Sequence, residues 1–320
     1  MRTNKTMIGA VDIGGTKIAV GIVDDAGAVL AKRDTPSGTQ CAYREGFARI
    51  VEMLRATSQE CGAEIGGIGI GSTGPVDPFT GGFGDVDLLP LWRHTNPVEE
   101  LTAIFGVPVA VENDADAGAL GEAAWGAGQG KQRLIYVTIG TGIGGGIILD
   151  GQLYRGVDGA HPEISHHVMD FSGPACSCGL RGCWEILATG PAMSAWFHSQ
   201  PANEASEEVS AREICEKARA GDALARRAVE READFLGIGL ANLINLFTPD
   251  TIVLGGSLMK SADLLLNRAR AVVRQGCRFV PAQKCEIVPA SLGEDANLIG
   301  AARVWHHRFA HSRMKEKARG

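Results

Sequence analysis

The sequence has no apolar run near the roughly 18 residues that a membrane-spanning helix needs. Its first residues, MRTNKTMIGAVDIGG, also lack the long apolar core and small-residue cleavage site of a secretory signal. Both absences favour a cytoplasmic protein without a membrane partner.

Cysteine and positive charge are also scarce. Eight cysteines in 320 residues are too few for a disulfide scaffold, and five of them are scattered, which is typical of buried or inert thiols: Cys41, Cys61, Cys215, Cys277 and Cys285. Lysine and arginine number 31 against 37 acidic residues, which gives a net charge of -6. Because phosphate backbones select a basic face, this balance argues against a nucleic-acid partner.

Glycine, in contrast, is abundant. The chain has 43 glycines in 320 residues, close to twice the usual ~7%. They cluster where apolar runs end, so they predict turns in which backbone approaches another group closely. The remaining composition is that of a globular protein, and the length predicts about two domains.

Short apolar, β-branched runs alternate with segments of helical periodicity. Residues 8–33 predict a strand, a tight glycine turn, a strand, a turn and a strand, and residues 133–156 repeat the pattern. Between them we expect a helix, a strand, a short helix, a strand and a helix, in the ranges 43–62, 65–77, 97–106, 107–114 and 115–128. After a long irregular stretch we expect helices at 184–198, 210–247, 260–275 and from about 296, with strands at 251–256 and 285–289.

This order predicts an α/β fold with two similar halves. The predicted N-terminal domain covers residues 1–116 and about 297–320, because the last helix is expected to return to it. The predicted C-terminal domain covers residues 117–296.

DIGGTK, residues 12–17, follows the first predicted strand directly. The amides of Gly14 and Gly15 can line an anion pocket, Asp12 can hold Mg²⁺ through water, and Thr16 and Lys17 can meet phosphate oxygens. The motif is not a P-loop, since GxxxxGK[ST] is absent. A simple glycine turn between two strands is the alternative.

A second glycine turn, IGTGIGGG at residues 139–146, also follows an apolar strand. A dinucleotide-binding fold requires a helix to begin there, but another strand, IILDGQLY, follows, so that fold is rejected. LGGS at residues 254–257 supplies a third turn. Two paired turns of this kind indicate two clamps on one polyphosphate, with the candidate residues Gly140, Thr141, Gly142, Gly144, Gly255 and Gly256.

In VENDADAG, residues 111–118, Asn113 and Asp114 lie where a strand ends and a helix begins. An aspartate in that place is ordinarily a helix N-cap. A carboxylate at the mouth of a strand can also act as a general base.

A cluster of histidine and cysteine stands out in ISHHVMDFSGPACSCGLRGCWE, residues 164–185. Three thiolates and one imidazole satisfy tetrahedral zinc and leave no open coordination position, which predicts a structural site. Spacing alone leaves either His166 or His167 as the fourth ligand. Gly179 and Gly182 let the short loops between the cysteines turn. The candidate ligands are His166, Cys176, Cys178 and Cys183.

Taken in order, DIGGTK, STGPVD, END, IGTGIGGG, HPEISH, CSCGLRGCWE and VLGGS resemble the motifs of the ROK family (repressors, open reading frames and kinases) over residues 7–305. The resemblance implies two actin-like ATPase (ribonuclease H-like) domains with an active-site cleft between them and a structural zinc loop. DIGGTK and IGTGIGGG would then hold the phosphates of ATP, and LGGS would lie beside the adenosine.

The resemblance also implies roles for single residues. Asp114 matches the catalytic base that takes a proton from a sugar hydroxyl. The family spacing selects His166 as the zinc ligand. The positions that match sugar contacts are Asn113, Glu163, His166 and Glu185, with a backbone contact from Gly74. The implied activity is ATP- and Mg²⁺-dependent phosphorylation of a hexose, with glucose at the 6-hydroxyl as first choice, by a homo-oligomer such as a dimer.

Three positions depart from the family pattern: Pro162 and Ser165 around Glu163, and Leu88 where the family has asparagine. Fructose, mannose, N-acetylmannosamine and N-acetylglucosamine therefore stay open as substrates, and polyphosphate remains open as the donor. A sugar-responsive transcription regulator is the alternative of another class. We do not expect it, because such regulators carry an N-terminal helix-turn-helix domain and here the first phosphate motif begins at Asp12.

Overall fold

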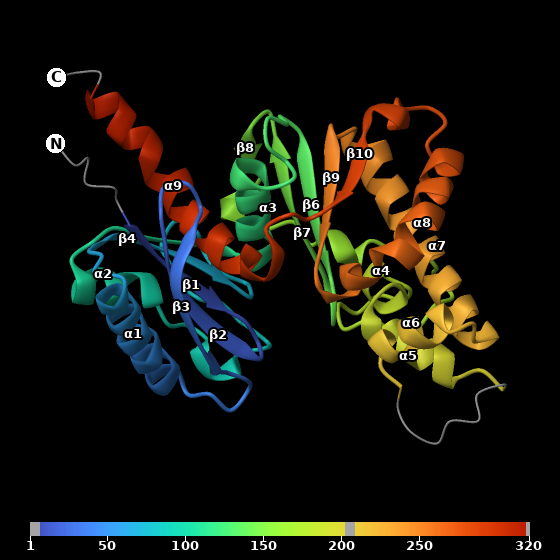
Figure 1. The fold of residues 1–320 in the computed structure, drawn as a ribbon, viewed down its shortest axis with the longest axis horizontal. Coiled ribbons are helices and arrows are strands. Elements are labelled where there is room, and N and C mark those ends of the chain that lie inside the picture. The colour runs from blue at the N-terminus through green and yellow to red at the C-terminus, as the bar shows by residue number, and fades with distance from the viewer. Residues whose placement is uncertain (1–6, 202–208, 318–320) are drawn as a thin grey trace.

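The computed structural model describes residues 7–201 and 209–317, with the side chains of the last helix described as far as residue 309. Two five-stranded sheets dominate it (Figure 1). The first contains β3 (Val29–Pro36), β2 (Lys17–Val23), β1 (Met7–Ile13), β4 (Ile65–Ser72) and β5 (Val109–Asn113), in that spatial order. The second contains β8 (Gln152–Leu153), β7 (Ile143–Leu149), β6 (Leu134–Ile139), β9 (Thr251–Gly255) and β10 (Glu286–Pro289).

The two sheets share one topology. In the first, β1 pairs antiparallel with β2 and parallel with β4, and β4 pairs parallel with β5. In the second, β6 pairs antiparallel with β7 and parallel with β9, and β9 pairs parallel with β10. The prediction of an α/β fold with two similar halves is therefore confirmed.

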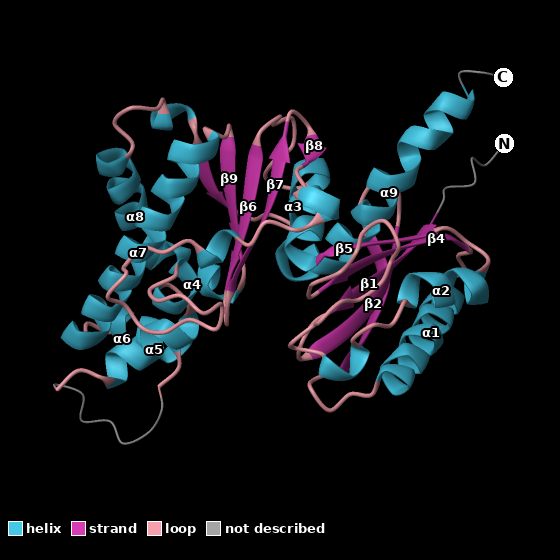
Figure 2. Cartoon of the chain, turned by 180° about the vertical axis from the view of Figure 1, so that it is seen from behind, coloured by secondary structure: helices cyan, strands magenta, loops and turns pink. Residues whose placement is uncertain are grey.

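Helices cover both faces of each sheet (Figure 2). On the first sheet, α1 (Tyr43–Glu60) and α2 (Pro97–Phe105) lie on one face and α9 (Ala296–Lys317) on the other. On the second sheet, α3 (Asp114–Trp125) lies on the face toward α9, and the opposite face carries the remaining helices: α4 (Trp184–Leu187), α5 (Gly190–His198), α6 (Ala211–Arg219), α7 (Ala223–Phe247) and α8 (Ala262–Gly276). Short 3-10 turns that matter below are η3 (Ile164–His166), η4 (Ser257–Ser261) and η6 (Gly293–Asp295).

Two predicted helical ranges are confirmed as helical, but each is divided into two helices. The range 184–198 divides at Thr189, whose hydroxyl caps α5 by accepting a hydrogen bond from Ala192 N at 3.3 Å. The range 210–247 divides at Gly221, which has φ +102°, and at Asp222, whose carboxylate accepts from Ala225 N at 2.7 Å. In both places a capping side chain outweighs the continuing apolar period.

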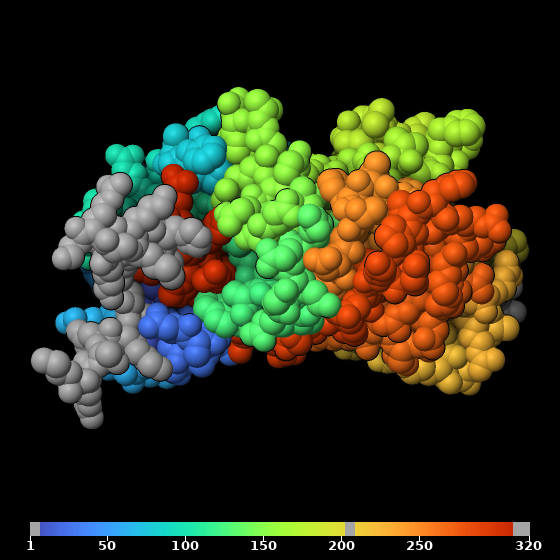
Figure 3. All heavy atoms as spheres, turned by 90° about the horizontal axis from the view of Figure 1, so that it is seen from above, coloured from blue at the N-terminus to red at the C-terminus, as the bar shows by residue number. Residues whose placement is uncertain are grey.

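The last helix packs closely on the first sheet because β4 offers glycines. A side chain at Gly67 would overlap the Trp305 ring, and one at Gly69 would overlap the Ala301 carbonyl oxygen. Seen from above, the red residues of α9 lie between blue and cyan residues of the first half (Figure 3).

The predicted boundary at residue 116 falls inside α3, which contacts both α9 and the second sheet. Among the described residues, no helix is both long enough and apolar enough to cross a membrane.

Candidate active site

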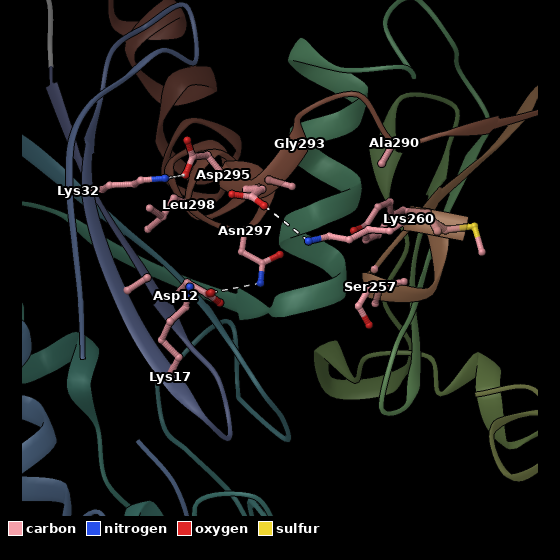
Figure 4. Close-up of a pocket in the computed structure, with 18 of the residues that line it drawn as sticks. Asp12, Lys17, Lys32, Ser257, Lys260, Ala290, Gly293, Asp295, Asn297 and Leu298 are labelled. Carbon is pink, nitrogen blue, oxygen red and sulfur yellow. Dashed lines mark hydrogen bonds and ion pairs between the residues drawn. The ribbon is translucent and has the colours of Figure 1, made fainter. Parts of the chain in front are cut away.

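A cavity of about 870 Å³ opens between the two sheets (Figure 4). Asp12 and Lys17 line it from β1 and β2, and Tyr136, Gly255 and Gly256 line it from the second half. Four of the predicted nucleotide-binding residues, Asp12, Lys17, Gly255 and Gly256, thus meet at one space. Its size suits a ligand such as a nucleotide.

Asp12 is the buried carboxylate of this cavity, only 7% exposed. It accepts a hydrogen bond from Asn297 Nδ2 at 3.1 Å. Burial, together with the negative charge of Asp114, raises its pKa to about 6, although the Asn297 hydrogen bond and the charge of Lys17 act in the opposite direction. A buried carboxylate of this kind gains from a cation beside it, and carboxylate oxygens are the hard ligands that Mg²⁺ prefers.

Three lysines at the cavity wall make ion pairs with acidic residues. Lys32 Nζ lies 2.6 Å from Asp295 Oδ1 and Lys260 Nζ lies 3.6 Å from Glu294 Oε1, so each half of the protein reaches η6 with one lysine (Figure 4). Lys17 Nζ lies 3.7 Å from Asp34 Oδ2. Such exposed pairs are weak, so the ammonium groups can exchange their partners for ligand phosphates at little cost.

The glycines of the first two predicted turns lie outside the wall of this cavity. Gly14 N donates to Lys17 O at 2.9 Å, and Gly140 N donates to Gly142 O at 2.9 Å, so both motifs form tight turns. Gly15 packs against the Leu88 side chain. The predicted nucleotide-binding residues that do not line the cavity are Gly14, Gly15, Thr16, Gly140, Thr141, Gly142 and Gly144.

Asp114 is the first residue of α3, directly after β5. The N-cap is Asn113, whose Oδ1 accepts from Ala115 N at 2.8 Å, so the interpretation of Asp114 as the cap was wrong. Asp114 Oδ1 also accepts from Ala115 N at 2.8 Å. Burial raises the pKa of Asp114, and the negative charges of Asp116 and Glu163 add to the rise, whereas the Ala115 N–H and the charge of His161 oppose it. A carboxylate with a raised pKa is a stronger base near neutral pH.

The register of the first sheet brings Asp12 and Asp114 to one edge. Gly71 on β4 pairs with Asp12 on one side and with Glu112 on the other. A Cβ on Gly71 would lie 3.8 Å from Asp114 Cα. Both carboxylates therefore stand at the carboxyl ends of parallel strands, which is where α/β folds bind ligands.

The predicted sugar contacts gather around this edge in part. A Cβ on Gly74 would lie 3.2 Å from Asn113 Nδ2, so these two are neighbours. Glu163 is exposed and adds negative charge at Asp114. Glu185 on α4 instead contacts the second glycine turn, with its Oε2 3.2 Å from Ile143 N.

The histidine–cysteine cluster is assembled from η3 and the loop before α4. His166, Cys176, Cys178 and Cys183 place one ligand atom each within 4.8 Å of one another. His166 Nδ1 lies 3.5 Å from Cys176 Sγ, and Cys178 Sγ lies 3.5 Å from Cys183 Sγ. Tetrahedral zinc holds such atoms about 3.5–3.8 Å apart, given bond lengths of about 2.0–2.3 Å. The donor set therefore fits zinc.

His167 points away from this cluster, because its Nδ1 lies 2.7 Å from the Ile164 carbonyl oxygen. Gly179 and Gly182 have φ of +93° and +62°, as expected for residues that turn short loops. A Cβ on Gly182 would overlap the Asp170 carbonyl oxygen, so no other residue fits there.

Residues 8–308 match the family model described as ROK family. The chain belongs to the ROK family. It is 32% identical to a glucokinase of Thermotoga maritima over 309 residues, which cover 93% of this chain and 97% of that one.

Two solved ROK structures are similar to it. One is a ROK family glucokinase from Streptomyces griseus in complex with glucose and AMPPNP, with a TM-score of 0.78, 34% identity and coverage of 92% of this chain and 98% of the other. The second is a ROK family transcriptional regulator described as a homologue of the E. coli MLC protein, with a TM-score of 0.86, 25% identity and coverage of 99% and 82%.

Several residues at this ROK site escaped the sequence analysis. Asn297, Lys32 and Lys260 belong to no motif and reach the cavity only through the tertiary fold. His161 stands at the start of the HPEISH motif, so a signal existed, but nothing in the sequence paired it with Asp116, 45 residues earlier.

Proposed function

We propose that this protein transfers the γ-phosphoryl group of ATP to the 6-hydroxyl of glucose, with Asp114 as the general base. The observation that carries the proposal is the place of Asp114, a carboxylate of raised pKa at the same sheet edge as Asp12, which lines the large cavity. The likeness to glucokinases over more than nine-tenths of the chain supports the choice of sugar.

Phosphoryl transfer needs positioning and neutralisation of charge more than covalent chemistry. In the proposed reaction Asp114 accepts the proton of the sugar hydroxyl while the oxygen of that hydroxyl attacks the γ-phosphorus. ADP is the leaving group. Asp12 would hold Mg²⁺, which supplies positive charge to the phosphates when bound. Lys17 and the amides of the turn at Gly14 and Gly15 would meet phosphate oxygens, and Gly255 and Gly256 would lie beside the adenosine.

We propose that the sugar hydroxyls form hydrogen bonds with the side chains of Asn113, Glu163, His166 and Glu185, and that the backbone of Gly74 adds a contact. A polar, hydroxyl-rich substrate needs several fixed partners, because a misplaced hydroxyl leaves a buried polar group unpaired. The carboxylates of Asp116 and Glu163, which act electrostatically on Asp114, agree with this need.

The same proposal assigns a structural zinc ion to His166, Cys176, Cys178 and Cys183, whose separations suit it. The ion would fix the loop that aims Glu163 and His166. With Nδ1 of His166 directed at the cysteines, its Nε2–H is left to donate to a sugar hydroxyl.

The test is a coupled ADP-release assay with ATP and Mg²⁺ on glucose, mannose, fructose, allose, N-acetylglucosamine and N-acetylmannosamine. The Asp114→Asn protein serves as the blank, and loss of the base should lower turnover by about 10²–10⁴-fold while sugar binding, measured by calorimetry, persists. Turnover on glucose above all others supports the assignment. A preference for fructose or an N-acetylhexosamine would move the substrate within the family, and full activity in Asp114→Asn would refute the mechanism.

A sugar-responsive regulator is the second candidate, because the similar regulator structure has the higher TM-score, 0.86. A regulator would bind sugar but phosphorylate none of the panel, whether ATP or polyphosphate is offered as the donor. Binding of operator-type DNA in a gel-shift assay would then favour it.

We also propose that residues 1–116 with 297–320 form one domain and 117–296 the other, and that the protein is a homodimer. Asp12 and Gly255 then face each other across the cleft between domains. Light scattering during size-exclusion chromatography measures the molar mass and so tests the dimer, since a monomer would have a mass of 33.6 kDa.

A further inference from the structure

The segment between β8 and η3, residues 154–163, makes two ion pairs, one with the end of β5 and one with the start of α3. Arg155 donates through Nε and Nη2 to the carboxylate of Glu112. His161 Nδ1 lies 2.9 Å from Asp116 Oδ2. The pairs are largely buried, with side-chain exposures of 18% and 6% for Arg155 and Glu112, and of 14% and 2% for His161 and Asp116.

These two pairs bracket Asp114. Glu112 lies two residues before it and Asp116 two residues after it, so three carboxylates occupy five consecutive positions. The outer two are each held by a basic side chain of the segment. Within the part of the chain that the structure describes, the carboxylate of Asp114 has one hydrogen bond, from Ala115 N. Asp116 Oδ1 also lacks a partner, but it is buried, whereas Asp114 is only partly buried, so Asp114 is the member of the three that a substrate can reach.

The charges around His161 favour its protonated form. Burial opposes the charge, but the hydrogen bond to Asp116 and the negative charges of Asp116, Glu163 and Asp114 leave the pKa of His161 above its ordinary value. Asp114 in turn faces His161, Asp116 and Glu163, and it interacts electrostatically with Asp12 on β1 and Tyr136 on β6. Of these groups, His161 is the one that can carry positive charge.

We propose that His161, oriented by Asp116, is a positioning residue for Asp114, which it fixes against the segment that carries Glu163 while supplying the positive charge beside the base. The inference rests on the proposed function, since it assigns His161 to the reaction of Asp114. His161 acts through Asp114 and need not touch the sugar. Its place directly before Pro162 and Glu163 ties the geometry of the base to that of the sugar loop.

The first test compares wild type, His161→Asn and His161→Ala by the pH dependence of kcat/KM on the best sugar. Asparagine can still donate to Asp116 but carries no charge. Loss of that charge raises the pKa of Asp114, so the acid limb of the profile should move to higher pH, with the plateau nearly intact. Alanine also removes the hydrogen bond, and the plateau should fall about 10- to 100-fold through misplacement of the base, with KM for ATP almost unchanged.

A matched control is available in His94, whose Nε2 lies 3.4 Å from Asp85 Oδ1 in a pair that is about three-quarters exposed. His94→Gln should keep kcat/KM within about twofold of wild type, as surface changes do. Thermal unfolding of each variant reports folding, and if His161→Ala unfolds, His161→Asn decides. Profiles of both His161 variants with the wild-type acid limb would overturn the proposal.

The second test needs no turnover. The imidazole of His161, identified by its loss in His161→Asn, is titrated by NMR in wild type, Asp114→Asn and Asp116→Asn. Each substitution removes a negative charge beside the ring, so the midpoint of His161 should fall in both. Unchanged midpoints overturn the inference whatever the activity. Lowered midpoints in a protein that phosphorylates no sugar would support the coupling of His161 to Asp114 and refute the kinase assignment instead.

Discussion

Glu232 on α7 offers a direct measurement of the cost of a buried charge in this fold. Its side chain is fully buried in the core of the second half, and neither carboxylate oxygen has a hydrogen-bond partner among the described residues. Burial raises its pKa from 4.5 to about 8, with the charge of Arg231 acting against the rise. Glu232→Gln removes the ionisation while it keeps the shape of the side chain.

The magnitude follows from linkage between proton binding and folding. A carboxyl group with a raised pKa in the folded state stabilises that state at pH below its unfolded value, and this stabilisation is lost as pH rises through the folded value. Wild type should therefore lose up to about 1.4 kcal/mol per pH unit between pH 4.5 and pH 8 on account of Glu232. Over the whole interval the loss amounts to about 3–5 kcal/mol, and Glu232→Gln should escape it.

Urea denaturation at pH 6, 7, 8 and 9, followed by circular dichroism, measures this difference. The gap between variant and wild type should grow with pH up to about 8 and then level off. Glu230→Gln on the same helix is the matched control, because Glu230 is 55% exposed and pairs with Arg268 on the surface. A constant gap at every pH, or a gap of equal size in the control, would refute the reasoning.

Three further predictions concern the site. Asn297→Ala removes the hydrogen bond that lowers the pKa of Asp12, so more of Asp12 should be protonated at pH 6.5. KM for MgATP should therefore rise several-fold at pH 6.5 and approach the wild-type value at pH 8.5. Steady-state kinetics at the two pH values measure this. Cys178→Ser should abolish bound zinc in elemental analysis and lower kcat/KM for sugar with little change in KM for ATP, whereas a full zinc content would contradict the assigned ligands. Arg155→Met leaves Glu112 buried without its partner and should cost about 3–5 kcal/mol in urea denaturation, most of which the double variant with Glu112→Gln should recover.

Much of the fold could be predicted because its signals are local. Strands β1 and β2 and their glycine turn recur as β6 and β7, and each is a short apolar run bounded by glycine. The breaks at Thr189 and Gly221 were missed, although a Thr-Gly-Pro and a Gly-Asp sequence stand there, because apolar residues keep a helical spacing across both. A capping hydrogen bond decides whether one helix or two form, and the spacing of apolar residues carries no information about such a bond.

The site, like the fold, has parts that local sequence motifs predict and parts that they do not. Asp12, Asp114 and the cysteine cluster were found because each lies in a motif of few residues. The lysine pairs at η6 could not be found, since Lys32 and Asp295 are 263 positions apart and meet only when α9 docks. His161 was visible in its motif, but its role depends on Asp116, and no local pattern connects them.

The packing of α9 on β4 has a consequence for the nascent chain during synthesis. The first sheet receives the cover of one face from Trp305 and Ala301, which are among the last described residues to leave the ribosome. The second half is complete in sequence before that helix exists. In a nascent chain, β1, β4 and β5 therefore keep an uncovered apolar face throughout the synthesis of the second half. A chaperone would bind the chain in this interval.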